Sequence, residues 1–162
     1  MDEILEILEK DARITPDEIA KMLKKSPQRI REVIKKYEKE GVILKYKTVI
    51  NKNLLKGINT EEVWALIEVN VAPQKDVGFD KIAERIYSFP EVVSCYLVSG
   101  TYDLLLVVKG KDLHTVASFV AEKLAPLENV KGTTTHFLLK KYKEDGIILK
   151  HKEDDKRIAI SY

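Results

Sequence analysis

Apolar side chains recur at helical spacing in two short runs near the start of the chain. Ile4, Leu5 and Leu8 predict a first amphipathic helix over residues 2–10, with no obvious capping residue before it. A second helix is predicted to begin at residues 15–18 (TPDE). There a hydroxyl cap, a proline at the first helical position and a glutamate three residues after the cap form a capping box.

A third run follows after a very short interval. Ser26 and Pro27 repeat the cap-plus-proline signal and predict a helix over about residues 27–40, which Gly41 ends. The buried stripe of this helix is predicted to consist of Ile30, Val33, Ile34 and Tyr37. Two helices joined by so tight a turn have the spacing of a helix-turn-helix. Residues 42–50 predict an extended segment, whose Lys45 and Lys47 can face a nucleic-acid backbone.

Periodicity changes in the second part of the chain. Residues 63–71 alternate between apolar and polar and predict a strand, and residues 79–87 return to helical spacing. Residues 92–98 and 104–108 predict a hairpin, followed by a helix over residues 113–124 and a strand over residues 130–139. The order strand, helix, strand, strand, helix, strand is that of a ferredoxin-like βαββαβ unit.

The predicted fold class is therefore α+β, with an N-terminal winged helix-turn-helix and a C-terminal ferredoxin-like domain. We expect the boundaries to be residues 1–50 for the first domain, 51–60 for a linker rich in Asn, Lys and Gly, and 61–142 for the second domain. Residues 143–162 form a C-terminal extension. Residues 146–149 and 157–162 predict short strands around the charged turn 152–156, with a frayed tail as the alternative.

Two helices can cover one face of a four-stranded sheet and leave the other face open. An open apolar face or edge in so small a domain favours association with a second copy, so we expect at least a homodimer.

Charge is distributed unevenly along the chain, although the net charge is +2. Residues 1–20 carry seven acids and two bases, whereas residues 21–47 carry ten bases and three acids. The basic segment coincides with the helix that helix-turn-helix geometry sends into the major groove, and this coincidence predicts binding to double-stranded DNA. The alternative is a three-helix bundle whose lysines are only solvated.

The predicted DNA-binding residues lie on the third helix and its cap. Arginine can make two hydrogen bonds to guanine and glutamine two to adenine, so the residues near the N-terminus of the helix are candidates for base contacts. The lysines further along are candidates for phosphate contacts. The full set is Ser26, Gln28, Arg29, Arg31, Glu32, Lys35, Lys36 and Lys39.

Other classes of function find little support in the sequence. No apolar run approaches the roughly 18 residues of a membrane span, and no secretory signal is visible, so we expect a cytoplasmic protein without a membrane partner. The single cysteine, Cys95, lies in an apolar strand and is expected to be a small core residue. The three histidines lack metal-ligand spacing. We therefore expect no metal, no cofactor and no catalysis, with a small ferredoxin-like enzyme as a weaker alternative.

With both halves in view, the chain resembles the Lrp/AsnC family of feast/famine transcription regulators over nearly its whole length. Residues 14–20 (ITPDEIA) resemble the opening of that family's second helix, and Ser26-Pro27 with Ile30, Glu38 and Gly41 resemble its recognition helix and exit. Residues 99–103 (SGTYD) resemble the family's glycine-to-aspartate turn, and residues 133–135 (TTT) its polar final strand.

The resemblance implies dimers joined through the C-terminal domains, assembly into tetramers or octamers, and an amino acid or similar small effector bound between dimers. The implied effector residues are Ser99, Gly100, Thr101, Tyr102, Asp103, Thr133 and Thr135. Glycine lets backbone amides approach an α-carboxylate, and Asp103 can accept bonds from an α-ammonium group. On residue type alone, a hairpin turn in which Asp103 bonds to the backbone is equally well supported.

Val33 departs from the family pattern, since many relatives have an arginine there, so the operator sequence of a relative does not transfer to this chain. An amino-acid sensor without DNA binding is a further alternative. It requires that the basic face of the third helix is covered by protein instead of nucleic acid.

Overall fold

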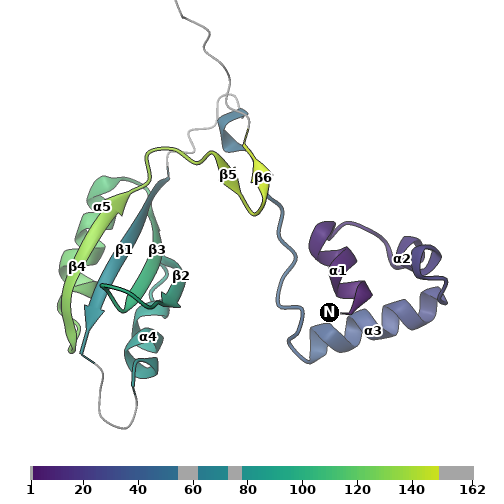
Figure 1. Cartoon of the computed structure of the whole chain (residues 1–162). Helices are drawn as coiled ribbons and strands as arrows, with labels where there is room; N and C mark the ends of the chain where they lie inside the picture. Colours follow the sequence, from purple (N-terminus) through teal and green to yellow (C-terminus); the bar gives the residue numbers. More distant parts are fainter. Residues whose placement is uncertain (1, 55–61, 73–77, 150–162) are drawn as a thin grey trace, which may run out of the picture. The chain divides into compact units, whose positions relative to one another are not determined.

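The computed structural model describes residues 2–54, 62–72 and 78–149. The chain divides into two compact units, residues 1–50 and 51–162, and each has its own hydrophobic core. No helix in the described ranges is long and apolar enough to cross a membrane. The elements, coloured along the chain in Figure 1, are α1 (Glu3–Lys10), α2 (Pro16–Leu23), α3 (Pro27–Lys39), the 3₁₀ turn η1 (Lys52–Leu54), β1 (Val63–Val71), α4 (Asp80–Tyr87), β2 (Val92–Leu97), β3 (Leu104–Gly110), α5 (Leu113–Ser118), the π-helical segment η2 (Phe119–Leu124), β4 (Val130–Phe137), β5 (Lys143–Glu144) and β6 (Ile147–Ile148).

The first unit consists of three helices around a small core. Ile19 of α2 and Ile30 of α3 are fully buried, and Ile4, Leu8 and Ala20 complete the buried cluster. The predicted bounds of α1 and α3 are confirmed to within one residue, and α2 begins at the predicted cap and proline. Helical spacing predicts that Met22 points inward together with Ile19 and Leu23, but Met22 is 61% exposed, because an eight-residue helix in so small a unit buries only a narrow stripe.

Side-chain caps define where each of these helices begins. The predicted capping box between Thr15 and Glu18 is present, and Ser26 Oγ accepts from the backbone amide of Arg29 at 3.3 Å. The expectation that α1 lacks a cap is wrong. Asp2 Oδ1 accepts from the amide of Ile4 at 2.8 Å, which is the ordinary role of aspartate before a helix.

Asp2 also joins α1 to α3, because its Oδ2 accepts a hydrogen bond from the Tyr37 hydroxyl at 2.7 Å. This bond, followed by the bond from the Ile4 amide, lowers the pKa of the Asp2 carboxyl below its ordinary value of 3.8. A carboxyl whose pKa is lowered by folding stabilises the fold above its unfolded pKa and loses that contribution as the pH falls through the folded-state pKa.

We therefore expect Asp2→Ala to lower the free energy of unfolding by about 1 kcal/mol at pH 7. The difference from the wild type should begin to shrink as the pH falls below about 4, where the unfolded chain takes up the proton, and it should be lost once the pH has fallen below the lowered pKa of the folded-state carboxyl. Urea unfolding at several pH values measures both effects, and a difference that persists unchanged at low pH would contradict them.

The segment after α3, which the sequence predicts to be extended, contains no regular secondary structure. The amides of Val42 and Ile43 both donate to the Tyr37 carbonyl, which turns the chain back over the end of α3, and residues 44–50 form neither helix nor strand. A lone extended segment has no neighbour to complete its backbone hydrogen bonds, so its sequence pattern alone does not produce a ladder.

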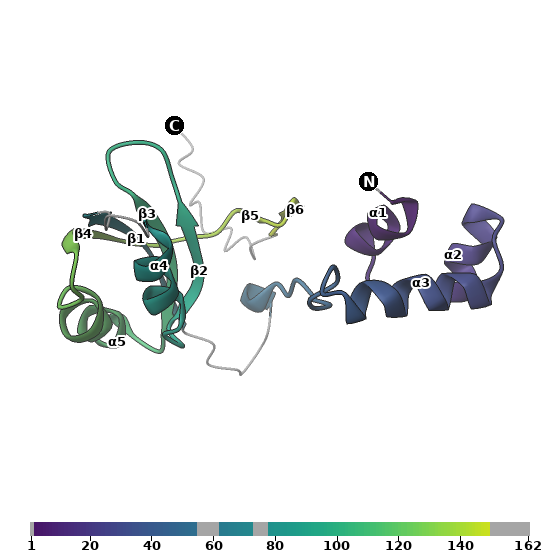
Figure 2. The same ribbon diagram turned by 90° about the horizontal axis from the view of Figure 1, so that it is seen from below.

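The second unit contains the predicted βαββαβ order. Its sheet is antiparallel with the strand order β2-β3-β1-β4, and β1 has the predicted bounds. Side chains of α4 and α5 pack with alternate residues of β1 and β3 in one core, so both helices cover the same face of the sheet (Figure 2). Tyr87 and Leu113, at the ends of the predicted helical stripes, are exposed.

The predicted helix over residues 113–124 is interrupted in its middle. It begins as α5 and continues as η2, where the amide of Ala125 donates to the Val120 carbonyl at 2.8 Å. Phe119 and Leu124 remain buried through the wider turns, so the apolar stripe is kept while the backbone pattern changes.

A short hairpin follows β4, and its second strand, β6, lies within the strand predicted over residues 146–149. β5 pairs with β6 through Asp145 and Gly146, which have positive φ angles of 46° and 80°. Asp-Gly with both φ angles positive is the type I′ signal for a two-residue hairpin, and β5, the strand that this turn joins to β6, was not predicted from the sequence. Residues 152–156 and 157–162 lie outside the described residues.

Candidate DNA-binding surface and effector site

One side of α3 carries the predicted DNA contacts. Burial of Ile30 against α2 orients the opposite side of the helix outward. The predicted residues on this side are all exposed, and we refer to them together as the α3 face: Gln28, Arg29, Arg31, Glu32, Lys35, Lys36 and Lys39. Ser26 is exposed as well, but its hydroxyl oxygen is engaged in capping the helix.

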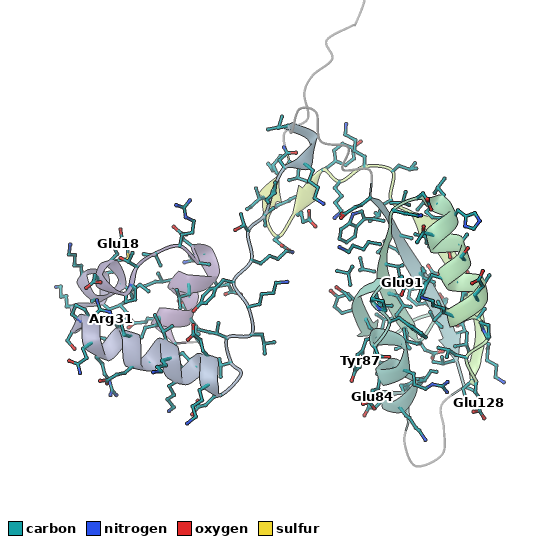
Figure 3. The ribbon with its side chains drawn as sticks, turned by 180° about the vertical axis from the view of Figure 1, so that it is seen from behind. Glu18, Arg31, Glu84, Tyr87, Glu91 and Glu128 are labelled. Atoms are coloured by element: carbon teal, nitrogen blue, oxygen red, sulfur yellow. The ribbon has the colours of Figure 1, made fainter. Side chains whose placement is uncertain are left out.

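Side chains in the N-terminal half of the α3 face are paired through hydrogen bonds or ion pairs. Gln28 Nε2 donates to Glu32 Oε1 at 3.3 Å, and Arg29 Nη1 lies 3.9 Å from Glu32 Oε2. Arg31 Nη2 donates to both carboxylate oxygens of Asp17, at 2.9 and 2.7 Å. Figure 3 labels Arg31 on this helix. Asp17 was missed as a site residue because it lies fourteen positions away, and no local pattern predicts the pair.

The C-terminal half of the α3 face is basic. Lys36 Nζ lies 3.8 Å from Glu40 Oε1, whereas Lys35 and Lys39 make no ion pair with any described residue. Exposed ammonium groups along one helix can neutralise DNA phosphates and release their counterions.

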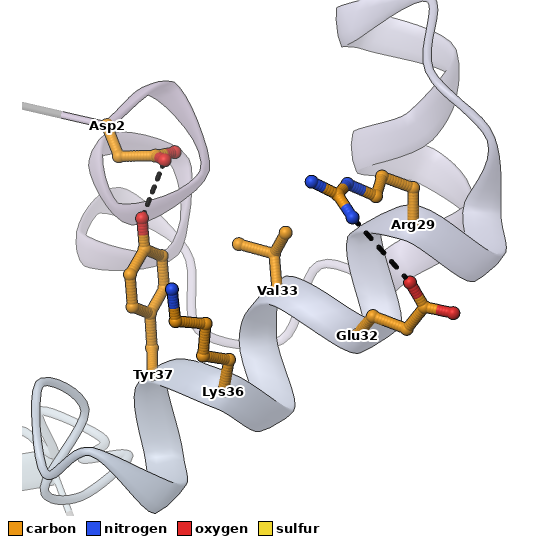
Figure 4. Close-up of a pocket in the computed structure, with 6 residues that line it drawn as sticks. All are labelled: Asp2, Arg29, Glu32, Val33, Lys36 and Tyr37. Carbon is orange, nitrogen blue, oxygen red and sulfur yellow. Dashed lines mark hydrogen bonds and ion pairs between the residues drawn. The ribbon is translucent and has the colours of Figure 1, made fainter.

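A shallow pocket of about 400 Å³ borders the α3 face where the N-terminus of α1 approaches α3 (Figure 4). Val33 is half-buried in its wall, as its place in the apolar stripe predicts. The other walls are charged or hydroxyl-bearing and include the Asp2–Tyr37 hydrogen bond. This lining does not suit an apolar ligand.

Asp103 is bonded to the backbone in the second unit. Its Oδ2 accepts from the amide of Val71 at 2.8 Å, and its own amide donates to the Val69 carbonyl at 3.1 Å. The side chain thus extends the β1–β3 ladder by one bond beyond Leu104, next to the point where the β1–β4 register shifts. The backbone role that residue type alone allowed is therefore present, and Oδ1 makes no hydrogen bond to a described residue.

The other residues implied by resemblance lie around this turn or on β4. Residues 99–102 belong to the connection between β2 and β3, where Ser99, Gly100 and Thr101 are exposed and Tyr102 is half-buried. Gly100 has a φ of 150°, which a residue with a side chain rarely adopts. Thr133 and Thr135 lie opposite Val69 and Ile67, so they belong to the face of the sheet that the helices cover. Thr133 on β4 and Asp103, the residue before β3, lie on opposite sides of Val69.

Comparison with known proteins agrees with this architecture in both units. Residues 3–43 match the winged helix-turn-helix DNA-binding model, and residues 64–148 match the Lrp/AsnC ligand binding domain. The HTH-type transcriptional regulator YugG of Bacillus subtilis is 48% identical, over 98% of this chain and 95% of its own. The HTH-type transcriptional regulator FL11 of Pyrococcus furiosus is 32% identical, over 87% of this chain and 88% of its own.

Solved structures give the same result. A transcriptional regulator of Neisseria meningitidis in complex with L-methionine superposes with a TM-score of 0.66 and 26% identity, covering 89% of this chain and 93% of that one. The domain match spans more than half of the chain, and the relatives match it along nearly their whole length. The chain therefore belongs to the Lrp/AsnC family of helix-turn-helix transcription regulators.

Proposed function

We propose that the α3 face enters the major groove of double-stranded DNA and gives this regulator its sequence specificity. The observation that carries the proposal is an exposed, capped helix whose first turns carry Gln28, Arg29 and Arg31 and whose last turns carry three exposed lysines. Side chains in the first turns of such a helix reach base edges, and lysines further along meet phosphates. Footprinting of wild-type protein on genomic or randomised duplexes tests the proposal, and the absence of any protected site would contradict it.

We expect Lys35→Ala to weaken binding to preferred and shuffled duplexes by the same factor. Lys35 has no ion pair with a described residue, so its charge is available to a phosphate. Loss of one phosphate contact should reduce the slope of log K against log salt by about 0.9. Fluorescence anisotropy at several salt concentrations measures the slope, with Lys81→Ala on α4 as a matched loss of charge outside the α3 face. A wild-type slope in Lys35→Ala would exclude Lys35 from the interface.

The second unit is proposed to bind an amino acid or a similar small molecule that modulates assembly or DNA binding. Relatives of known structure include the Neisseria regulator with L-methionine, and this similarity supports the same class of ligand here. The turn at Gly100 offers exposed backbone, and Asp103 Oδ1 is available to an α-ammonium group. A thermal-shift screen with each common amino acid tests this part, and no shift with any of them would overturn it.

The open face of the sheet supports a homodimer. Trp64 and Leu66 of β1 and Leu105 and Val107 of β3 alternate with the core residues, so they lie on the face that the helices leave uncovered, where they are half-buried. An apolar sheet face in so small a domain is stabilised by contact with a second copy. Light scattering with and without the effector measures the mass and shows whether dimers assemble into tetramers or octamers. A monomer at all concentrations would contradict the dimer.

The proposed function has no catalytic step. Burial raises the pKa of the Cys95 thiol, which keeps it in its less nucleophilic, protonated form at neutral pH. Among the described residues, no three His, Cys, Asp or Glu side chains are grouped as metal ligands. A regulator of this kind works where the chromosome is, so we place it in the cytoplasm.

A further inference from the structure

An exposed ion pair connects the two helices of the helix-turn-helix. Arg31 on α3 donates from one nitrogen, Nη2, to both carboxylate oxygens of Asp17 on α2, at 2.9 and 2.7 Å. Both side chains are little more than half exposed, at 55% and 56%. Exposed pairs of this kind add little to stability. Because Arg31 belongs to the α3 face, the Asp17–Arg31 pair is placed to affect DNA recognition.

The backbones on both sides of the pair are held in place by other contacts. Asp17 is the second residue of α2, after the Thr15 cap and Pro16, and Thr15 and Glu18 bind each other in the capping box. Arg31 follows Ile30, whose side chain is fully buried in the same core as Ile19 of α2. The fold thus fixes the distance between α2 and α3 before any DNA binds, and the carboxylate restricts the long arginine side chain to one direction.

Arg29 on the same face is held much more loosely. Its contact is Glu32 on its own helix, with Nη1 and Oε2 3.9 Å apart. The two arginines therefore differ in preorganisation although both are exposed and both lie in the first turns of α3. An arginine that is held in one direction discriminates better between bases, because it cannot turn toward an acceptor on a different base.

We propose that Asp17 is a positioning residue for base recognition, acting through Arg31. The carboxylate occupies Nη2 and leaves the Nη1 and Nε donors of Arg31 without a partner among the described residues. It also places a negative charge beside the DNA surface, which weakens binding to every sequence. Asp17 thus lowers affinity for DNA of any sequence and increases discrimination between sequences. This inference rests on the proposed entry of the α3 face into the major groove.

The test compares full-length wild type, Asp17→Asn, Arg31→Ala and the double variant. The probes are a duplex that the wild type selects from a randomised library and a shuffled version of the same duplex. In Asp17→Asn we expect tighter binding to the shuffled duplex and a drop of about tenfold in the ratio of the two affinities, within the range of one good arginine–base contact. The double variant should have the same ratio as Arg31→Ala, because Asp17 acts through that side chain.

Glu3→Gln is the matched control. Glu3 on α1 pairs with Lys25 at 3.6 Å, so this change also removes one acidic partner from a pair within the first unit. It should raise affinity for both duplexes by the same small factor and leave their ratio unchanged. Melting temperatures separate these effects from loss of folding. If Asp17→Asn is unstable, Asp17→Ala provides the same test, since it also removes the carboxylate that holds Arg31.

Three outcomes would overturn the inference. A wild-type ratio in Asp17→Asn, a shuffled-duplex affinity in Asp17→Asn no higher than in the wild type, or a further loss of ratio in the double variant would each contradict the role given to Asp17. Failure of the proposed function gives a different result, because the wild type itself would then select no duplex from the library.

Discussion

Arg31→Ala is expected to lower affinity for the preferred duplex by about tenfold and to relax base preference at one or two positions. The guanidinium stands on the exposed side of α3 and is directed by Asp17. One good arginine–base contact contributes about 1 to 3 kcal/mol of discrimination, and alanine removes all of it. Selection from a randomised library with each protein measures which positions lose their preference.

Arg85→Ala on α4 serves as the control for this experiment, since it removes the same charge from an exposed position in the second unit. It should leave the selected sequence unchanged. If Arg31→Ala selects the same sequence with the same affinity as the wild type, Arg31 does not contact the bases.

Asp103→Ala and Asp103→Asn are expected to separate a structural role from a binding role. Alanine removes the acceptor of the Val71 amide and should lower the free energy of unfolding by about 1 to 3 kcal/mol, because a shielded backbone N–H loses its partner. Asparagine keeps a carbonyl acceptor for that amide and removes the negative charge. It should therefore fold with nearly wild-type stability and fail to bind the α-ammonium group of the effector.

Urea unfolding and thermal shift with the amino acid found in the screen measure the two roles. Equal destabilisation by both substitutions would show that the charge itself matters to the fold. A wild-type thermal shift in Asp103→Asn would remove Asp103 from the effector site while leaving its role at the end of the β1–β3 ladder.

Local signals in the sequence were sufficient for most of the fold. The box of Thr15 and Glu18 and the cap at Ser26 depend on residues within one turn of each other, and the alternation in β1 is a property of the strand alone. These features predicted helix starts, strand bounds and the βαββαβ order because each is decided by near neighbours along the chain.

The missed features depend on tertiary packing. Asp17 meets Arg31 because Ile19 and Ile30 share a core, and the Asp103 side chain meets Val71 across 32 positions of sequence. Neither contact has a local pattern that would predict it.

The hairpin of β5 and β6 is a different case. The Asp145-Gly146 turn signal is local, but the strands on either side of it have only two residues each, which is too short for an alternating apolar pattern to mark them.

The DNA-binding surface and the effector site were predicted from different kinds of information. Caps, spacing and charge located the α3 face without reference to any relative, whereas the effector residues came from resemblance. The structure gives Asp103 a backbone partner and places Thr133 and Thr135 on the helix-covered face of the sheet.

The salt dependence of DNA binding tests the central claim most directly. Full-length wild type and the combined Lys35→Ala, Lys36→Ala and Lys39→Ala variant are titrated against the selected duplex at several salt concentrations. If the α3 face holds the DNA, the wild-type affinity falls steeply with salt, and the variant has a slope smaller by about 2 to 3. Binding that is absent in the wild type, or that has the same slope in both proteins, would contradict the assignment of the α3 face as the DNA-binding surface.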